Sequence, residues 1–141
     1  MTSLRVLRES GAGLTVDELA EKSGVSRASI IAYGQKQPDT MRVETAHKLA
    51  TALGIDIDGF HAAMSDVRMA TEIAYHLKAV RALNAADIHD NLLPWDRMIS
   101  MLPDGALENR SVTELTEMFE LIDRAWKDGY AARDIDAILV D

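Results

Sequence analysis

The chain has 141 residues, of which 48% are hydrophobic and 27% charged, a composition typical of a folded globular protein. It contains no cysteine, which excludes disulfide bonds and thiolate metal sites. No apolar run approaches the roughly 18 residues that a membrane-spanning helix needs, and the N-terminus lacks the apolar stretch of a signal peptide. We therefore expect a cytoplasmic protein with no membrane partner.

The net charge of −8 is distributed unevenly along the chain. Residues 1–55 contain seven Lys and Arg against six Asp and Glu, whereas residues 56–141 contain eight against seventeen. Phosphate contacts need Lys and Arg, so the total charge alone would argue against a nucleic-acid partner. The N-terminal part is nearly neutral, however, and remains compatible with DNA binding of weak nonspecific affinity.

The first elements in the chain are a short helix and a helix-turn-helix. A helix is expected over residues 1–10 and is ended by the glycines of residues 11–13. Thr15 and Glu18 then form a capping box that opens a second helix. Gly24 marks a tight turn, and Ser26 can cap the helix that follows. Two short helices joined by such a turn are typical of proteins that place the second helix in the major groove.

Two more helices complete the N-terminal half. The helix that begins at Ser26 is expected to end near Tyr33, where Gly34 supplies a stop. A helix over residues 41–53 has apolar residues at three- and four-residue spacing, and Asp56 caps a short helix after it. These elements predict a five-helix domain over residues 1–62.

The second half of the chain remains helical in pattern and shows no strand alternation. Helices are expected over residues 67–84 and 95–102, and a second capping box, Ser111 with Glu114, opens an amphipathic helix over residues 111–128. The fold class is therefore all-α, with a smaller acidic helical domain over residues 63–141.

Four segments carry a resemblance to a known family. They are LRVLRE, LTVDELAEKSGVS, SRASIIAY and TAHKLATALGIDIDGF. From about Leu4 to Phe60 the chain resembles the Cro/lambda-repressor-like, XRE-type helix-turn-helix family. The resemblance implies a sequence-specific DNA-binding transcriptional regulator, with a repressor of the phage or prophage type as the expected function and a double-stranded operator as the partner.

The resemblance also implies the residues that read DNA. Arg27, Ala28 and Ala32 occupy the positions that face base edges, and Ser26 and Ser29 are placed to meet phosphates. An Arg can form a bidentate pair with guanine, and methyl groups can meet thymine methyls. Further backbone contacts are expected from Gln35, Lys36 and Arg42.

Ile31 is a fourth expected base contact. Ile31 follows Ile30, and two adjacent residues of a helix cannot both face the core. If Ile30 faces the core, Ile31 is exposed and would contact DNA or a partner. The chain departs from the family pattern at Val16, where members often carry Gln, and in the loop of residues 35–40, which is shorter than in the family. The contact made by that Gln is therefore expected to be absent.

The acidic second half has three interpretations. It is a solvated helical domain, a homodimer interface, or a docking site for another protein. A single helix-turn-helix contacts little DNA, and two-fold dimers overcome this by reading two half-sites. The expected dimer or partner interface consists of Leu115, Phe119, Ile122 and Trp126. The alternative function is an antitoxin or antirepressor that acts through this half.

Catalytic and metal-binding chemistry is not expected. The four histidines, which are His47, His61, His76 and His89, show no HxxxH or HxH pair. There is no nucleophile elbow and no glycine-rich phosphate loop. The sequence thus predicts no enzyme, no metal and no cofactor.

Overall fold

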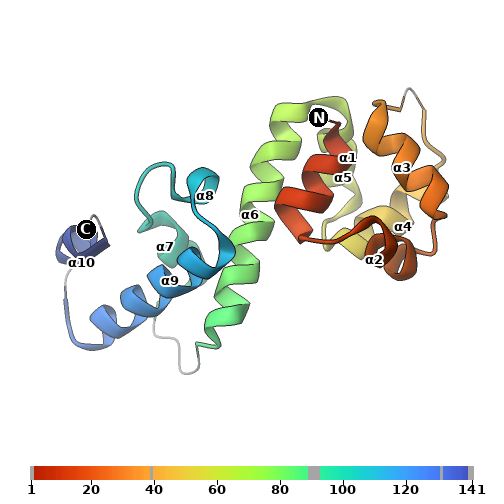
Figure 1. Cartoon of the computed structure of the whole chain (residues 1–141). Coiled ribbons are helices and arrows are strands. Elements are labelled where there is room, and N and C mark those ends of the chain that lie inside the picture. The colour runs from red at the N-terminus through yellow and green to blue at the C-terminus, as the bar shows by residue number, and fades with distance from the viewer. Residues whose placement is uncertain (1, 39, 89–92, 131, 140–141) are drawn as a thin grey trace. The chain divides into compact units, whose positions relative to one another are not determined.

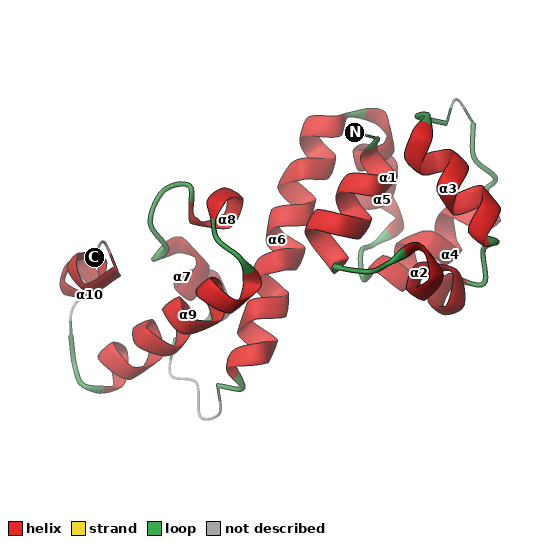
Figure 2. Cartoon of the chain, in the orientation of Figure 1, coloured by secondary structure: helices red, strands yellow, loops and turns green. Residues whose placement is uncertain are grey.

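A computed structural model describes residues 2–38, 40–88, 93–130 and 132–139. Within these residues every regular element is helical, which confirms the all-α prediction (Figure 2). In chain order the elements are α1 (Ser3–Val6), the π-helical η1 (Leu7–Ala12), α2 (Val16–Ser23), α3 (Arg27–Gln35), α4 (Val43–Leu53), α5 (Ile57–Ser65), α6 (Val67–Ala86), α7 (Trp95–Ser100), α8 (Ala106–Asn109), α9 (Val112–Lys127) and α10 (Ala132–Leu139). No helix in the described ranges is long and apolar enough to cross a bilayer.

The chain divides into two compact units, residues 1–78 and residues 79–141. The boundary falls within α6, whose first part packs in the first unit and whose last part packs in the second (Figure 1). This boundary lies beyond residue 62, where the sequence suggested a change of domain, because Ala70 and Ala74 are buried in the first core. The assignment of one function to each unit stays a prediction.

The core of the first unit holds α2, α3 and α4 together. Leu19, Ile30 and Leu49 come from these three helices, and each is at most 2% exposed. Phe60 from α5 is fully buried in the same cluster. The expected cap of α5 is present, since the backbone N–H of Gly59 donates to Asp56 Oδ1 at 2.7 Å. The inward face of each short helix is therefore fixed by a shared core.

The sequence suggested that Gly11 ends the first helix. In the structure Gly11 lies inside the π-helical segment η1. The helix ends at Gly13, which has the left-handed φ of 65°. A Cβ on Gly11 would lie 3.1 Å from Ala74 Cα and 3.0 Å from Leu77 Cδ1. Gly11 is thus needed because the backbones of η1 and α6 approach closely within the first unit.

We expect Gly11→Val to destabilise the first unit by about 1–3 kcal/mol, because the added side chain overpacks the contact with α6. Gly34→Val is the control: Gly34 also lies in a helix, and a Cβ there meets no atom within 4 Å. Urea unfolding followed by amide resonances of residues 1–78 measures both variants. Equal midpoints for the two valines would contradict the close approach at Gly11.

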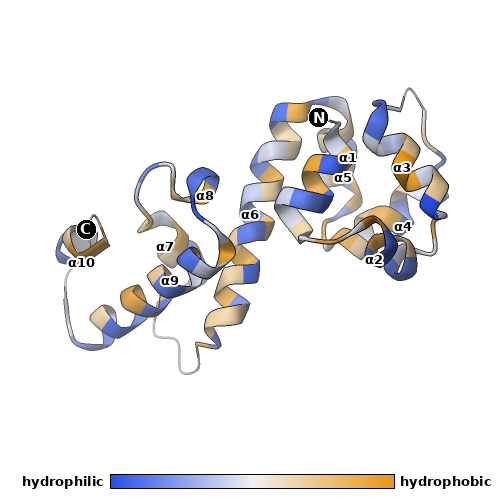
Figure 3. Ribbon diagram, in the orientation of Figure 1, coloured by the Kyte–Doolittle hydropathy of each residue, from blue (hydrophilic) through white to orange (hydrophobic). Residues whose placement is uncertain are grey.

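The core of the second unit is built mainly on one face of α9. Leu115, Phe119 and Ile122 are fully buried there, with Met98 from α7 and Ile135 from α10. Figure 3 shows the mixture of hydrophobic and hydrophilic segments along α9. The amphipathic pattern of residues 111–128 therefore marks an intramolecular core.

The second capping box is only half formed. The backbone N–H of Glu114 donates to Ser111 Oγ at 3.1 Å, but the Glu114 carboxylate pairs with Arg110 Nη1 at 3.1 Å. The hydrogen bond from Arg110, followed by those from Ser111, lowers the pKa of Glu114. The carboxylate thus pairs with a cation four residues earlier and also accepts from Ser111 Oγ at 3.3 Å. Residues 89–92, which include His89, lie outside the described residues.

Candidate nucleic-acid interface

The helix-turn-helix is shaped by hydrogen bonds between residues close in sequence. Glu18 N donates to Thr15 Oγ1 at 3.1 Å and Thr15 N donates to Glu18 Oε1 at 3.0 Å, which confirms the predicted capping box. The hydrogen bonds from the backbone and then the side chain of Thr15 lower the pKa of Glu18. Gly24 ends α2 with a φ of 74°, and Val25 is buried at the corner. Local chemistry therefore sets where α3 begins.

Helix α3 presents one face to solvent and anchors the other. Ile30 is 2% exposed in the first core, whereas Arg27, Ala28 and Ala32 are exposed. Ile31 is half-buried, so it lies between the two faces. Three of the four residues proposed to meet bases thus lie on the exposed side of α3, and Ile31 lies at its border.

Arg27 has a partner that the sequence patterns did not identify. Its Nε donates to Asp17 Oδ1 at 2.6 Å. Asp17 lies in the first turn of α2 and Arg27 is the first residue of α3, so the pair links the starts of the two helices. Both side chains remain mostly in solvent, with 65% of Arg27 and 75% of Asp17 exposed. An opposite charge at the start of each helix is the only sequence signal for this contact.

Ser26 and Ser29 are joined to each other at the start of α3. Ser26 Oγ accepts from Ser29 N at 3.2 Å, which confirms the predicted cap, and donates to Ser29 Oγ at 2.8 Å. Ser26 is an exposed residue and Ser29 is half-buried. A phosphate oxygen that approached here would meet these hydroxyls beside the positive end of the helix dipole.

The remaining proposed phosphate contacts flank the loop between α3 and α4. Gln35 is the last residue of α3, so the helix continues through Gly34. The prediction that Gly34 ends this helix was wrong. A glycine without a positive φ costs a helix only modest stability, and the helix can therefore pass through it. Lys36 is the C-cap of α3, and Arg42 is the N-cap of α4 without a side-chain cap hydrogen bond. Gln35, Lys36 and Arg42 are all exposed.

Gln37, which the sequence did not single out, ties this loop to the rest of the first unit. Its Oε1 accepts from Ser3 N at 2.9 Å, and its Nε2 donates to Ser3 Oγ at 3.2 Å and to the Met64 carbonyl at 2.6 Å. Ser3 is fully buried. One amide side chain therefore satisfies polar groups of α1 and α5 while it holds the chain that leaves α3.

We expect Gln37→Ala to lower the free energy of unfolding by about 1–3 kcal/mol, because the buried amide of Ser3 loses its acceptor. Gln35→Ala is the matched control and should change stability by less than about 0.5 kcal/mol, since Gln35 is exposed. Thermal melts and the hydrogen-exchange rate of the Ser3 amide measure the difference. An unchanged hydrogen-exchange rate of the Ser3 amide in Gln37→Ala would show that the hydrogen bonds between Gln37 and Ser3 are not formed in solution.

The residues expected at a dimer or partner interface lie in a different environment. Leu115, Phe119 and Ile122 are fully buried in the second core, and Trp126 is partly buried against it. An interface formed by Leu115, Phe119 and Ile122 would require this core to open, because these side chains already pack within their own chain. Among the described residues of the second unit, the large apolar side chains that are exposed are others: Val80, Trp95, Leu121, Tyr130 and Ile138.

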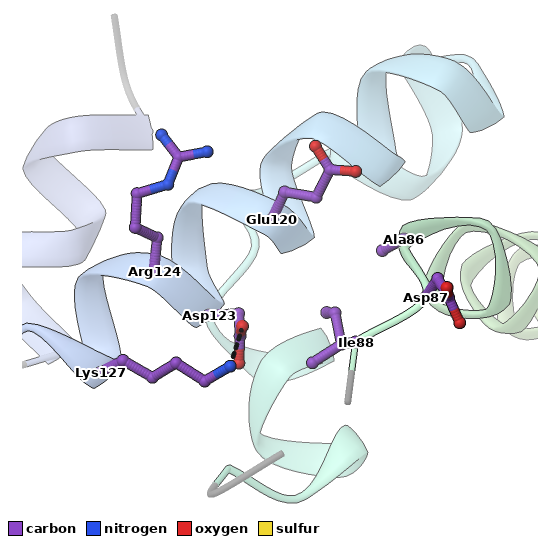
Figure 4. A pocket seen from close by; sticks show the side chains of 7 residues that line it. All are labelled: Ala86, Asp87, Ile88, Glu120, Asp123, Arg124 and Lys127. Atoms are coloured by element: carbon purple, nitrogen blue, oxygen red, sulfur yellow. Dashed lines mark ion pairs between the residues drawn. The ribbon is translucent and has the colours of Figure 1, made fainter. Parts of the chain in front are cut away.

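The second unit also carries an open groove beside α9 (Figure 4). Lys127 Nζ and Asp123 Oδ2 form an ion pair of 2.9 Å at its edge. The groove mixes carboxylates with cations, so its charge selects neither anions nor cations. It is lined by Ala86, Asp87, Ile88, Glu120, Asp123, Arg124 and Lys127.

Comparison with protein-family models matches residues 4–60 to the helix-turn-helix family. The match confirms the resemblance read from Leu4 to Phe60 and supports a DNA-binding transcription regulator of the XRE type. The matched range ends in α5, so the second unit lies outside it. Comparison with curated proteins and with solved structures gave no match.

Proposed function

Residues 4–60 belong to the helix-turn-helix family, and we propose that the chain is a transcriptional repressor that reads a short operator with the outer side of α3. The observation that carries this proposal is the division of α3 into an anchored and an open side. Ile30 is locked in the core while Arg27, Ala28 and Ala32 are exposed. A helix held in this way can enter the major groove without rearranging.

The proposed base contacts combine one polar reader with apolar ones. The Arg27 guanidinium would form two hydrogen bonds with O6 and N7 of a guanine. The methyl groups of Ala28, Ile31 and Ala32 would pack against thymine methyls, since these side chains have no hydrogen-bonding groups. Specificity would then rest on one guanine in each half-site, on thymines and on DNA shape.

The proposed phosphate contacts set the orientation of the domain. Ser26 and Ser29 would meet one phosphate at the start of α3, and Gln35, Lys36 and Arg42 would meet others beside the loop. Such contacts position a protein but carry no sequence information. With few cations available, we expect modest salt dependence compared with strongly basic DNA-binding proteins.

We propose further that the chain binds as a homodimer through the second unit. One helix-turn-helix buries little surface on DNA, whereas a two-fold dimer reads two half-sites about 34–36 Å apart. The exposed Leu121 on α9 and Ile138 on α10 supply apolar surface for a second copy. Sedimentation of the full chain tests this, and a monomer at concentrations far above the Kd for DNA would contradict it.

A second candidate function is an antitoxin or antirepressor that acts through the second half of the chain. The observations that favour it are the seventeen acidic residues after residue 55 and the absence of residues 61–141 from the family match. Such a protein would bind one partner through an acidic surface, and its helix-turn-helix would serve a secondary role.

Selection of bound DNA from a random pool with the full chain tests the proposed function. We expect enrichment of two similar half-sites, related by two-fold symmetry and separated by one turn of DNA or a multiple of it. Failure to enrich any sequence would contradict the repressor. Recovery of one stoichiometric protein partner in the same material, together with that failure, would support the second candidate.

A further inference from the structure

We propose that Asp17 is a positioning residue that sets how strictly Arg27 selects guanine. In this proposal the Asp17 carboxylate orients the guanidinium for a base edge and weakens its attraction to phosphates elsewhere. The inference rests on the proposed function, because it concerns the selectivity of the same DNA-reading face.

The geometry singles out one edge of the guanidinium. Asp17 Oδ1 accepts from Nε of Arg27 at 2.6 Å, and this is the hydrogen bond described for the Arg27 side chain. Because the guanidinium is planar and rigid, a bond at Nε restricts the rotation of the whole group and does not use its two terminal nitrogens. These two nitrogens are the pair that can donate to O6 and N7 of guanine.

The pair is held between two rigid starting points. Asp17 lies in the first turn of a helix whose start is fixed by the Thr15 and Glu18 capping box. Arg27 follows the Ser26 cap of α3. Both helices pack through the first core, so the Cα atoms of the two residues cannot drift apart without disturbing it. The carboxylate can therefore hold a long, flexible side chain in one orientation before DNA arrives.

A contribution to fold stability does not account for this pair. Both side chains are mostly exposed, and an exposed ion pair contributes little to folding because water and salt screen it. Next to DNA, in contrast, a carboxylate repels phosphates whatever the sequence. Asp17 should thus reduce the affinity of the protein for all DNA. The reduction should be smallest at sites where a guanine accepts hydrogen bonds from both terminal nitrogens of Arg27.

The test measures selectivity in the full chain with three variants. The selected operator is compared with the same operator carrying adenine in place of the guanine in each half-site, and with random DNA. Asp17→Ala removes both the acceptor and the charge, and Asp17→Asn keeps an acceptor for Nε but removes the charge. Glu21→Gln removes one charge from an exposed position of the same helix and is the control for charge alone.

For the wild type we expect a preference for guanine of roughly 5–150-fold in each half-site. Asp17→Ala should lower this preference by about threefold or more, because the guanidinium regains its rotational freedom. Asp17→Asn should retain most of it. Both should bind random DNA more tightly than the wild type at low salt, and more so than Glu21→Gln.

An unchanged preference for guanine in Asp17→Ala would overturn the inference while leaving the proposed function intact. If the wild type selects no operator, the proposed function fails first and the inference falls with it. The resonance of Arg27 Nε–H adds a readout without DNA. It should be slow to exchange in the wild type and in Asp17→Asn, and fast in Asp17→Ala.

Discussion

Replacing Arg27 by alanine is expected to weaken binding to the selected operator by about 1–3 kcal/mol for each half-site, or roughly 5–150-fold. On a two-fold operator the dimeric variant loses this binding free energy in each of the two half-sites. We therefore expect it to show little preference for the operator over random DNA. The physical reason is that Arg27 is the one side chain among the proposed base contacts that can form hydrogen bonds with a base. Titrations with the operator, with its guanine-to-adenine variant and with random DNA measure the change.

Two controls separate the roles of charge and geometry at Arg27. Arg27→Lys keeps the positive charge but loses the planar fork, so it should bind random DNA normally and the operator poorly. Lys36→Ala removes a proposed phosphate contact, so it should weaken every sequence alike and reduce the salt slope by about one. If Arg27→Ala and Lys36→Ala had the same effect on all sequences, direct reading of guanine by Arg27 would be ruled out.

Asp17 must be considered in the same experiment. Arg27→Ala leaves the Asp17 carboxylate without this partner on the proposed DNA-binding face, and its repulsion of phosphates adds to the loss. The double variant Asp17→Ala with Arg27→Ala removes that repulsion. We expect it to recover affinity for all sequences without recovering the preference for guanine. The difference between the single and the double variant gives the coupling of the two side chains.

Phe119→Ala is expected to destabilise the second unit by about 3–5 kcal/mol, because the large side chain is fully buried and its removal leaves a cavity. Leu121→Ala is the matched control on the same helix. Leu121 is 38% exposed, so its truncation should cost less than about 1 kcal/mol. Both tryptophans of the chain, Trp95 and Trp126, belong to the second unit. Urea unfolding followed by tryptophan fluorescence therefore reports on this unit alone.

The same pair of positions distinguishes a core from a dimer seam. If Phe119 belonged to an interface between two chains, its loss would weaken the dimer, and the fall in the unfolding midpoint would vary with protein concentration. For an intramolecular core, the midpoint falls by the same amount at every concentration. Leu121→Glu should have the opposite profile: nearly normal stability of the single chain and a weaker dimer in sedimentation.

Several elements of the candidate site follow from the sequence because they depend on residues three or four positions apart. The caps at Thr15, Ser26 and Asp56 and the turn at Gly24 are present as predicted. Each is a hydrogen bond or backbone angle that a short segment satisfies by itself. The family match over residues 4–60 depends on the same local pattern.

The errors concern positions where a local signal competed with packing. Gly11 and Gly34 are typical helix-ending residues, yet both lie inside helical segments. At Gly11 the close backbone approach of α6 favours a residue without Cβ, and this approach involves residues more than sixty positions away. The box that Glu114 was expected to close with Ser111 is only half formed, and the Glu114 carboxylate also pairs with Arg110.

By itself, the sequence determined that the chain is helical, that a helix-turn-helix lies near its start, and that α9 has one apolar face. Only the tertiary structure decided what these surfaces contact. It buried Leu115, Phe119 and Ile122 in their own chain, and it brought Asp17 to Arg27 and Gln37 to Ser3. The physical reason is that a helical pattern specifies which side chains share a face, whereas the partner of that face is set by contacts between distant segments.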